Sequence, residues 1–298
     1  MPIARCLTLA CVLLAALTAC STLNDTADRT YSVLRASAPD TVEELEIEHA
    51  GSIRRARIVY PPRYGQRQMY PVLIDLHDAG NDGGFEMRAS GMAAAAHDRG
   101  FIAVFPDGVG AGQPGGPAWN AGPCCGYAQR SESQDLAFLN ALITRLIADH
   151  RADPKRVYIV GCGNGAQMAC RLACGLSHRL AGIGLVDGAL TVPNCRPVKP
   201  IPLIAIHYAP DAELDSVVEF WTRNNGCLAP ETTSNAQAQR TLHADPVRSA
   251  DLLLYQLSSP GKGWPGGDPD LALSPTNSFP AATVIVDFFA NRPGRQAP

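Results

Sequence analysis

A glycine-flanked turn carries the most direct chemical information in this 298-residue chain. Gly161-Cys162-Gly163-Asn164-Gly165 follows an apolar run and precedes a helical pattern, the strand–turn–helix setting in which G-x-S-x-G presents a nucleophilic serine. The central residue is Gly163, which has no oxygen or sulfur to attack a carbonyl. Cys162 is the nearest alternative nucleophile, but the second position of such a turn points away from the pocket. A plain glycine-rich turn is the remaining interpretation.

Glycine at the centre of such a turn has a predictable physical effect. Other residues there adopt a strained backbone conformation that costs about 1–3 kcal/mol, and glycine relieves that cost. We therefore expect Gly163 to preserve the fold while abolishing acyl transfer.

Two histidines, His77 and His207, each end an apolar run. Parallel strands bring such ends to one edge of the sheet, so both histidines are expected at the same rim. We interpret each as a structural hydrogen-bonding residue, with use of His207 as a general base as the alternative. No histidine lies at metal-ligand spacing from the cysteines, so no metal and no other cofactor is expected.

Short apolar runs alternate with helical patterns along most of the chain. The runs suited to buried strands lie at residues 72–76, 102–105, 157–160, 183–186, 203–206 and 252–257. The helical patterns lie at residues 85–99, 136–149, 166–176 and 281–290. This alternation predicts an α/β fold with a mostly parallel, doubly wound sheet in a single domain.

Three further segments complete the prediction of elements. Residues 44–49 and 53–60 alternate between apolar and polar side chains and predict antiparallel strands. Residues 107–126 and 232–248 are predicted to be irregular and to cover one edge of the site.

Composition is that of an ordinary globular protein, with 46% hydrophobic residues, 18% charged residues and a net charge of −3. These values exclude a disordered chain and a membrane protein with several spans. The near-neutral charge argues against nucleic acid as a partner.

Residues 1–19 have the pattern of a secretory signal, with Arg5 before an apolar run too short to span a bilayer comfortably. The ending Leu17-Thr18-Ala19-Cys20 resembles a bacterial lipobox, which implies cleavage before Cys20 and acylation of its thiol. Residues 20–42 would then tether a domain at 43–298 to the membrane of the cell envelope, with an outer membrane the expected location. An ordinary signal peptide followed by a chance cysteine is the alternative.

The cysteine count fits an exported protein in an oxidising compartment. Of the ten cysteines, Cys6, Cys11 and Cys20 belong to the signal and lipobox, which leaves seven in the mature domain and at least one thiol unpaired. Cys170 and Cys174 lie four residues apart on a predicted helix, so each is expected to bridge elsewhere. The candidate partners are Cys124, Cys125 and Cys195.

Eight segments in register resemble the secreted polyhydroxybutyrate depolymerase / feruloyl esterase group of α/β-hydrolases. They lie at residues 76–80, 100–108, 119–126, 134–138, 156–165, 221–227, 261–267 and 287–289. The resemblance implies an α/β-hydrolase fold and descent from esterases that act on polyesters or acylated plant polysaccharides.

Carried over position by position, the resemblance implies that the catalytic triad is not intact. Gly163 stands in the place of the serine, Lys262 stands in the place of the histidine, and Asp211 remains in the place of the acid. A protonated lysine, with a pKa of about 10.4, cannot take a proton from a nucleophile. We expect Lys262 and Asp211 to form an ion pair, or else to be two solvated loop charges.

The loop that supplies the oxyanion hole departs from the family as well. The family's His-Gly is His77-Asp78 in this chain, whereas Asn164 keeps the position that follows the nucleophile and supplies a backbone N–H. A carboxylate beside the place where negative charge develops would oppose that charge. The resemblance also implies that Cys227 is a free thiol, because a second family cysteine between Trp221 and Lys262 is missing.

Three functions from different classes are compatible with these residues. The first is a non-catalytic envelope lipoprotein whose pocket binds an acylated glycan, a polyester fragment or a partner protein. The second is a secreted carboxylic-ester hydrolase that uses unrecognised catalytic residues. The third is an envelope scaffold in which the pocket has no role.

Overall fold

The computed structural model describes residues 42–208, 212–271, 278–292 and 294. The predictions for the signal peptide, for Cys20 with the tether up to residue 41, and for Asp211 concern residues outside these ranges. No helix in the described ranges is long and apolar enough to cross a membrane.

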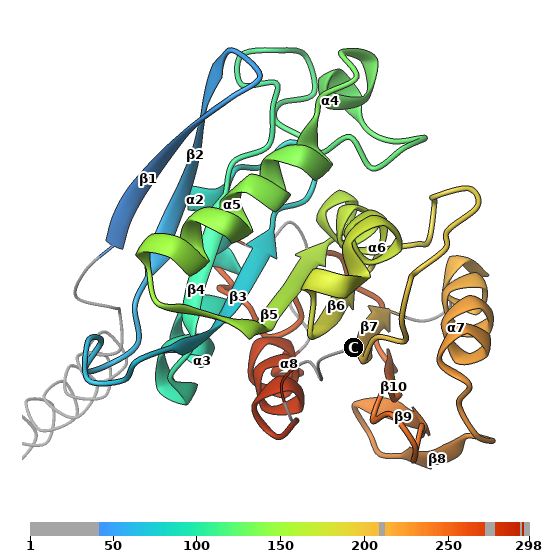
Figure 1. Ribbon diagram of the computed structural model, residues 1–298. Coiled ribbons are helices and arrows are strands. Elements are labelled where there is room, and N and C mark those ends of the chain that lie inside the picture. Colours follow the sequence, from blue (N-terminus) through green and yellow to red (C-terminus); the bar gives the residue numbers. More distant parts are fainter. Residues whose placement is uncertain (1–41, 209–211, 272–277, 293, 295–298) are drawn as a thin grey trace, which may run out of the picture. The chain divides into compact units, whose positions relative to one another are not determined.

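The strands of the domain form one sheet. They are β1 (Val42–His49), β2 (Ser52–Val59), β3 (Tyr70–Leu76), β4 (Ile102–Pro106), β5 (Ala152–Cys162), β6 (Gly182–Val186), β7 (Leu203–Tyr208), β8 (Glu231–Ser234), β9 (Ala238–His243) and β10 (Leu252–Leu257). Their order is β1-β2-β4-β3-β5-β6-β7-β10-β9-β8 (Figure 1). The central strands β4, β3, β5, β6, β7 and β10 are parallel, and antiparallel pairs extend both edges. The predicted mostly parallel sheet is confirmed.

Helices cover both faces of this sheet, as a doubly wound fold requires. They are α2 (Gly83–Ala89), α3 (Met92–Arg99), α4 (Gly126–Arg130), α5 (Asp135–Asp149), α6 (Asn164–Leu176), α7 (Ala212–Asn225) and α8 (Ala281–Ala290), with a short 3₁₀ turn at Ser177–Arg179. Apolar side chains of α5, α6 and α7 pack in one core, and those of α3 and α8 pack in a second core. Figure 1 shows α5 and α6 above the central strands and α3 and α8 below them.

Two predicted segments differ from the structure. Residues 85–99 are not one helix, because the chain breaks at Ser90-Gly91 and Gly91 has a φ of 73° that ends the regular helical path. Residues 232–248 are not irregular throughout, because β8 and β9 pair there as an antiparallel hairpin. All four residues of β8 are exposed, so this edge strand has none of the apolar alternation by which a strand is recognised.

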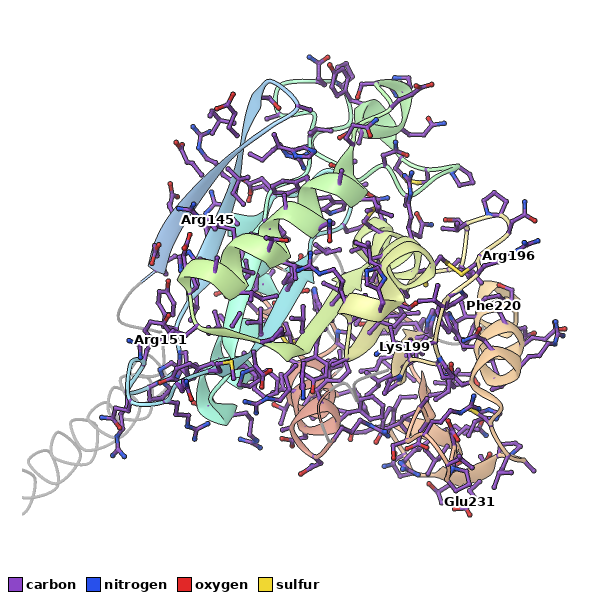
Figure 2. All side chains as sticks on the ribbon, viewed as in Figure 1. Arg145, Arg151, Arg196, Lys199, Phe220 and Glu231 are labelled. Carbon is purple, nitrogen blue, oxygen red and sulfur yellow. A yellow bond between two sulfur atoms is a disulfide. The ribbon has the colours of Figure 1, made fainter. Side chains whose placement is uncertain are left out.

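The cysteines pair in a way that only partly matches the prediction. Cys174 forms a disulfide with Cys195, one of its expected partners, visible beside Arg196 in Figure 2. Cys124 and Cys125 are joined to each other instead of to the helix. Cys170, on α6, is a free thiol that is fully buried in the core. Cys227 is free as well.

Candidate functional site

The glycine-flanked turn connects β5 to α6 at the carboxyl end of the sheet. Gly163 is the only residue between the two elements, and it has a φ of 51° and a ψ of −115°. A Cβ atom on Gly161 would overlap the backbone of Gly165, and a Cβ atom on Gly165 would overlap the carbonyl of Leu76. The flanking glycines are therefore needed for α6 to pack directly against β5 and β3.

The carboxylate of Asp78 lies directly above this turn. Its Oδ1 accepts a hydrogen bond from the backbone N–H of Ala79 at 2.7 Å and another from the backbone N–H of Asn164 at 2.8 Å. In α/β-hydrolases the oxyanion hole consists of an N–H from the loop after β3 and the N–H of the residue after the nucleophile. The N–H groups of Ala79 and Asn164 occupy the corresponding positions in this chain, and both donate to one oxygen of the Asp78 carboxylate.

The space above Gly163 is occupied by the same carboxylate. An ideal Cβ on Gly163 would lie 2.7 Å from Asp78 Oδ2 and closer still to Oδ1. Real Cβ atoms do not approach oxygens this closely, so a side chain at position 163 and the present Asp78 rotamer exclude each other.

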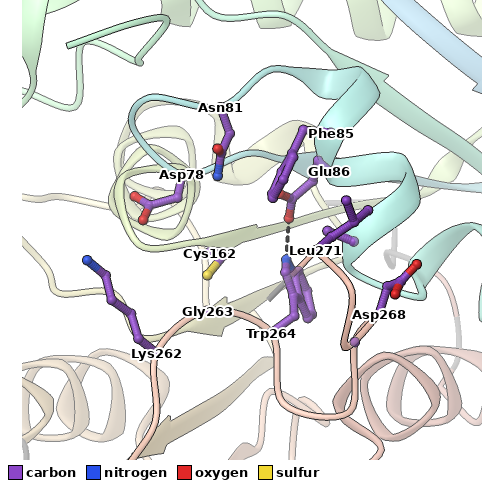
Figure 3. A pocket seen from close by; sticks show the side chains of 12 residues that line it. Asp78, Asn81, Phe85, Glu86, Cys162, Lys262, Gly263, Trp264, Asp268 and Leu271 are labelled. Atoms are coloured by element: carbon purple, nitrogen blue, oxygen red, sulfur yellow. Dashed lines mark hydrogen bonds between the residues drawn. The ribbon is translucent and has the colours of Figure 1, made fainter. Parts of the chain in front are cut away.

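A cavity of about 280 Å³ opens beside the turn. It is lined by Asp78, Ala79, Cys125, Cys162, Gly163, Asn164, Gln167, Asp187, Lys262 and Gly263. Lys262 and Asp78 also line a narrower cleft whose other wall includes Phe85, Trp264 and Leu271. Figure 3 shows the side chains of Lys262 and Asp78 extending from opposite sides of this cleft. The structure therefore brings together three of the positions singled out in the sequence: Asp78, Gly163 and Lys262.

Cys162 does not point away from the site as the turn geometry predicted. It lines both the cavity and the cleft, although only 3% of its surface is exposed. Burial raises the pKa of its thiol well above the usual value, and the nearby carboxyl groups of Glu86 and Asp78 raise it further. A thiol that stays protonated is a poor nucleophile.

His77 and Asn164 hold loops together at the rim. His77 Nε2 accepts a hydrogen bond from the backbone N–H of Gly108 at 2.9 Å, and its Nδ1 lies 2.8 Å from the carbonyl oxygen of Asp78. The Asn164 side chain exchanges two hydrogen bonds with the backbone of Trp119, at 2.7 and 3.1 Å. Burial lowers the pKa of His77, which favours the neutral ring required by these contacts. His207 is fully buried at the end of β7.

The site also contains a buried pair of carboxyl groups that sequence analysis did not identify. Asp75 on β3 is fully buried, and burial raises its pKa to about 7. The nearby Ser90 hydroxyl favours the ionised form of Asp75 but does not meet the geometry of a hydrogen bond. Burial raises the pKa of Glu86 on α2 well above its usual value, and the charge of Asp75 is the second largest cause of this rise. Glu86 accepts a hydrogen bond from the indole N–H of Trp264, drawn as a dashed line in Figure 3.

The signal for this pair was present in the sequence but weak. Asp75 interrupts the apolar run 72–76, which is unusual for a strand buried on both faces. Its contact with Glu86 depends on the packing of α2 against β3, which no local pattern specifies. Among the residues that the structure describes, no group of three side chains could hold a metal ion.

Comparisons with known proteins find that the chain is similar to esterases. No family model matches it. NocK of Nocardia uniformis subsp. tsuyamanensis, which carries the name "Putative esterase", is 31% identical over 176 residues, or 58% of this chain and 49% of NocK. "Feruloyl esterase B" of Piromyces equi is 29% identical over 160 residues, or 51% of this chain and 28% of that protein. The chain thus spans less than half the length of these curated relatives.

A solved structure has the same fold. The acetyl xylan esterase from Aspergillus awamori superposes with a TM-score of 0.57 over 72% of this chain and 92% of that one. The two chains are 13% identical, so the match concerns the fold alone. That fold is the one expected from the eight sequence segments.

Proposed function

The chain is an esterase-like α/β-hydrolase, and from that premise we propose that it is a non-catalytic member that binds its ligand without hydrolysing it. The observation that carries this proposal is Gly163, which stands where the nucleophile belongs and has no reactive atom. Loss of the nucleophilic serine from a serine hydrolase lowers kcat about a million-fold. The lysine at position 262 offers no compensation, because it has no nucleophile to deprotonate.

The ligand class is inferred from the side chains that line the cleft and from the names of the relatives. Phe85, Trp264 and Leu271 provide an apolar wall suited to an acyl group, whereas Lys262 and Asp78 provide a polar end. The relatives are named for feruloyl and acetylxylan esterase activity. We therefore infer that this chain binds an acylated glycan, with a polyester fragment as the other ester-bearing candidate.

The proposed location is the bacterial cell envelope. The signal pattern of residues 1–19 and the lipobox-like ending at Cys20 support export and acylation. The disulfide between Cys174 and Cys195 is compatible with an oxidising compartment.

An ester panel with a matched binding assay tests the absence of catalysis. The mature protein should hydrolyse p-nitrophenyl acetate and methyl ferulate no faster than buffer, and a fluorophosphonate probe should not label it. Feruloylated xylo-oligosaccharides should still bind in calorimetric titration. Turnover well above buffer, or probe labelling, would instead support an ester hydrolase with unrecognised residues, the alternative that the relatives' names favour. Absence of turnover and of binding by any ester-bearing ligand would support a scaffold.

Replacement of Cys20 tests the location. With the signal retained, Cys20→Ala should abolish labelling by radioactive palmitate and move the protein from the membrane fraction to the soluble fraction. Cys227→Ala is the matched control, because Cys227 is a free cysteine of the folded domain and should leave labelling unchanged. Palmitate incorporation that persists in Cys20→Ala would refute the lipoprotein assignment.

A further inference from the structure

The contacts of Asp78 match those that an esterase of this fold offers to its transition state. Both N–H donors of the oxyanion hole, those of Ala79 and Asn164, point to one carboxylate oxygen at 2.7 and 2.8 Å. Such distances are typical of charge-assisted hydrogen bonds between an N–H group and an oxyanion. Asn164 is also the first residue of α6, so the positive end of a 13-residue helix faces the same oxygen.

Gly163 lies below this carboxylate and leaves room for it. With any Cβ at position 163, the Asp78 side chain would have to leave the hole, because Oδ1 and Oδ2 occupy the space of that Cβ. The Asp78 carboxylate can therefore occupy this position only because residue 163 has no side chain.

We propose that the oxyanion hole of this chain is a carboxylate-binding site whose permanent ligand is its own Asp78. An external ligand cannot use the two N–H donors while Asp78 holds them, so it must be recognised by the other residues of the cavity. This inference rests on the proposed function, because it identifies Asp78 as the group that blocks the oxyanion hole in a non-catalytic member.

Removal of the internal ligand tests the proposal. Asp78→Ala leaves the donors of Ala79 and Asn164 without their acceptor, so the variant should have a lower melting temperature than the parent. Sodium acetate should then raise that temperature in a saturable way, by about 3–6 °C when acetate is tenfold above its dissociation constant. Sodium chloride at the same ionic strength should have no such effect, and the parent protein should respond to neither salt.

Asp82→Ala is the matched control. Asp82 is four residues further along, and its Oδ1 accepts the N–H of Phe85 at 2.7 Å to cap α2, so it does not bind the N–H donors of Ala79 and Asn164. This variant should also lose stability, but acetate should not restore it. If acetate stabilises both variants equally, or neither, the proposal is wrong.

A double-mutant cycle keeps the test decisive if Asp78→Ala does not fold. Gly163→Ala should lower the melting temperature at least about 3 °C more in the parent than in an Asp78→Gly background, because only the parent has a carboxylate in the way. The strain of alanine at a φ of 51° is common to both backgrounds and cancels. Equal losses would show that Asp78 does not occupy the hole.

These measurements are independent of the ester assay. Hydrolysis by the parent protein would refute the proposed function, whereas the acetate response and the mutant cycle report only on what fills the hole.

Discussion

Gly163 and Asp78 have to be interpreted as a pair at the residue scale. Considered alone, Gly163 suggests that a single serine would restore the enzyme. The carboxylate of Asp78 makes that inference incomplete, because a serine Cβ would overlap it and the oxyanion would find both N–H donors taken. A functional site therefore needs changes at both positions.

Stepwise reconstruction of the site gives a prediction at this scale. The double variant Gly163→Ser/Lys262→His should remain close to inactive on p-nitrophenyl acetate. The triple variant that adds Asp78→Gly should be faster by about 10²–10³-fold, the usual effect of an oxyanion-hole donor on kcat. Initial rates at pH 8 would measure this difference.

The control for that reconstruction is the triple variant with Asp82→Gly in place of Asp78→Gly. It removes a neighbouring carboxylate without opening the hole and should behave like the double variant. Equal rates of the double variant and the Asp78→Gly triple variant would contradict the role assigned to Asp78.

At the scale of elements, β3 and α2 bring two buried carboxyl groups close enough for the charge of Asp75 to raise the pKa of Glu86. The side chains of β3 alternate between the two cores, and this alternation directs Asp75 toward the face covered by α2 and α3. Glu86 meets it from α2 and is bonded in turn to Trp264, which stands on the same loop as Lys262. The pair therefore lies next to a wall of the cleft, which both Glu86 and Trp264 line.

The pH dependence of stability is the prediction that belongs to this pair. The folded pKa of Asp75 is raised to about 7 from 3.8, so its contribution to the free energy of unfolding is fully present below pH 4. That contribution, about 4 kcal/mol at most, is lost as the pH rises through 7, and the raised pKa of Glu86 extends the loss to higher pH. Urea unfolding at pH 5 and pH 8.5 should show the protein more stable at pH 5.

Neutral replacements provide the control for this pH effect. Asp75→Asn and Glu86→Gln keep the shape of each side chain but cannot ionise, so each should flatten the pH profile and raise stability at pH 8.5. A parent protein equally stable at both pH values, or variants with an unchanged slope, would contradict the assignment.

At the scale of the whole molecule, one disulfide links two layers of the fold. Cys174 near the end of α6 is joined to Cys195, which lies in the long connection between β6 and β7. This cross-link closes a loop across a sequence separation of 21 residues. A closed loop of this size stabilises a protein by about 3 kcal/mol, chiefly by restricting the unfolded chain.

Removal of this cross-link is the corresponding prediction. Cys174→Ala/Cys195→Ala should lower the melting temperature by about 6–12 °C in calorimetry. Cys227→Ala, which removes a free thiol from a half-buried position, should change it little. A double variant as stable as the parent would show that the cross-link contributes nothing to stability.

The central strands and most helices could be predicted because their signals are local. Buried parallel strands such as β6 and β7 are continuous apolar runs, and α8 has the bounds that its pattern predicts. The β8–β9 hairpin and the break between α2 and α3 could not be predicted in this way. Exposed polar residues form the outer edge strand of that hairpin. The left-handed backbone of Gly91 stands before α3, which packs against α8.

For the site, the sequence by itself determined which reactive atoms are missing. No fold can give Gly163 a reactive side-chain atom or turn Lys262 into an imidazole, so the residue types at these two positions are fixed by the sequence. Tertiary structure alone decided where Asp78 points and which carboxyl groups meet. The position of Asp78 depends on the approach of the loop after β3 to the start of α6, a contact between residues 86 positions apart. The meeting of Asp75 and Glu86 depends on the packing of α2 against β3. Distances of that kind arise from packing, and no local sequence pattern encodes them.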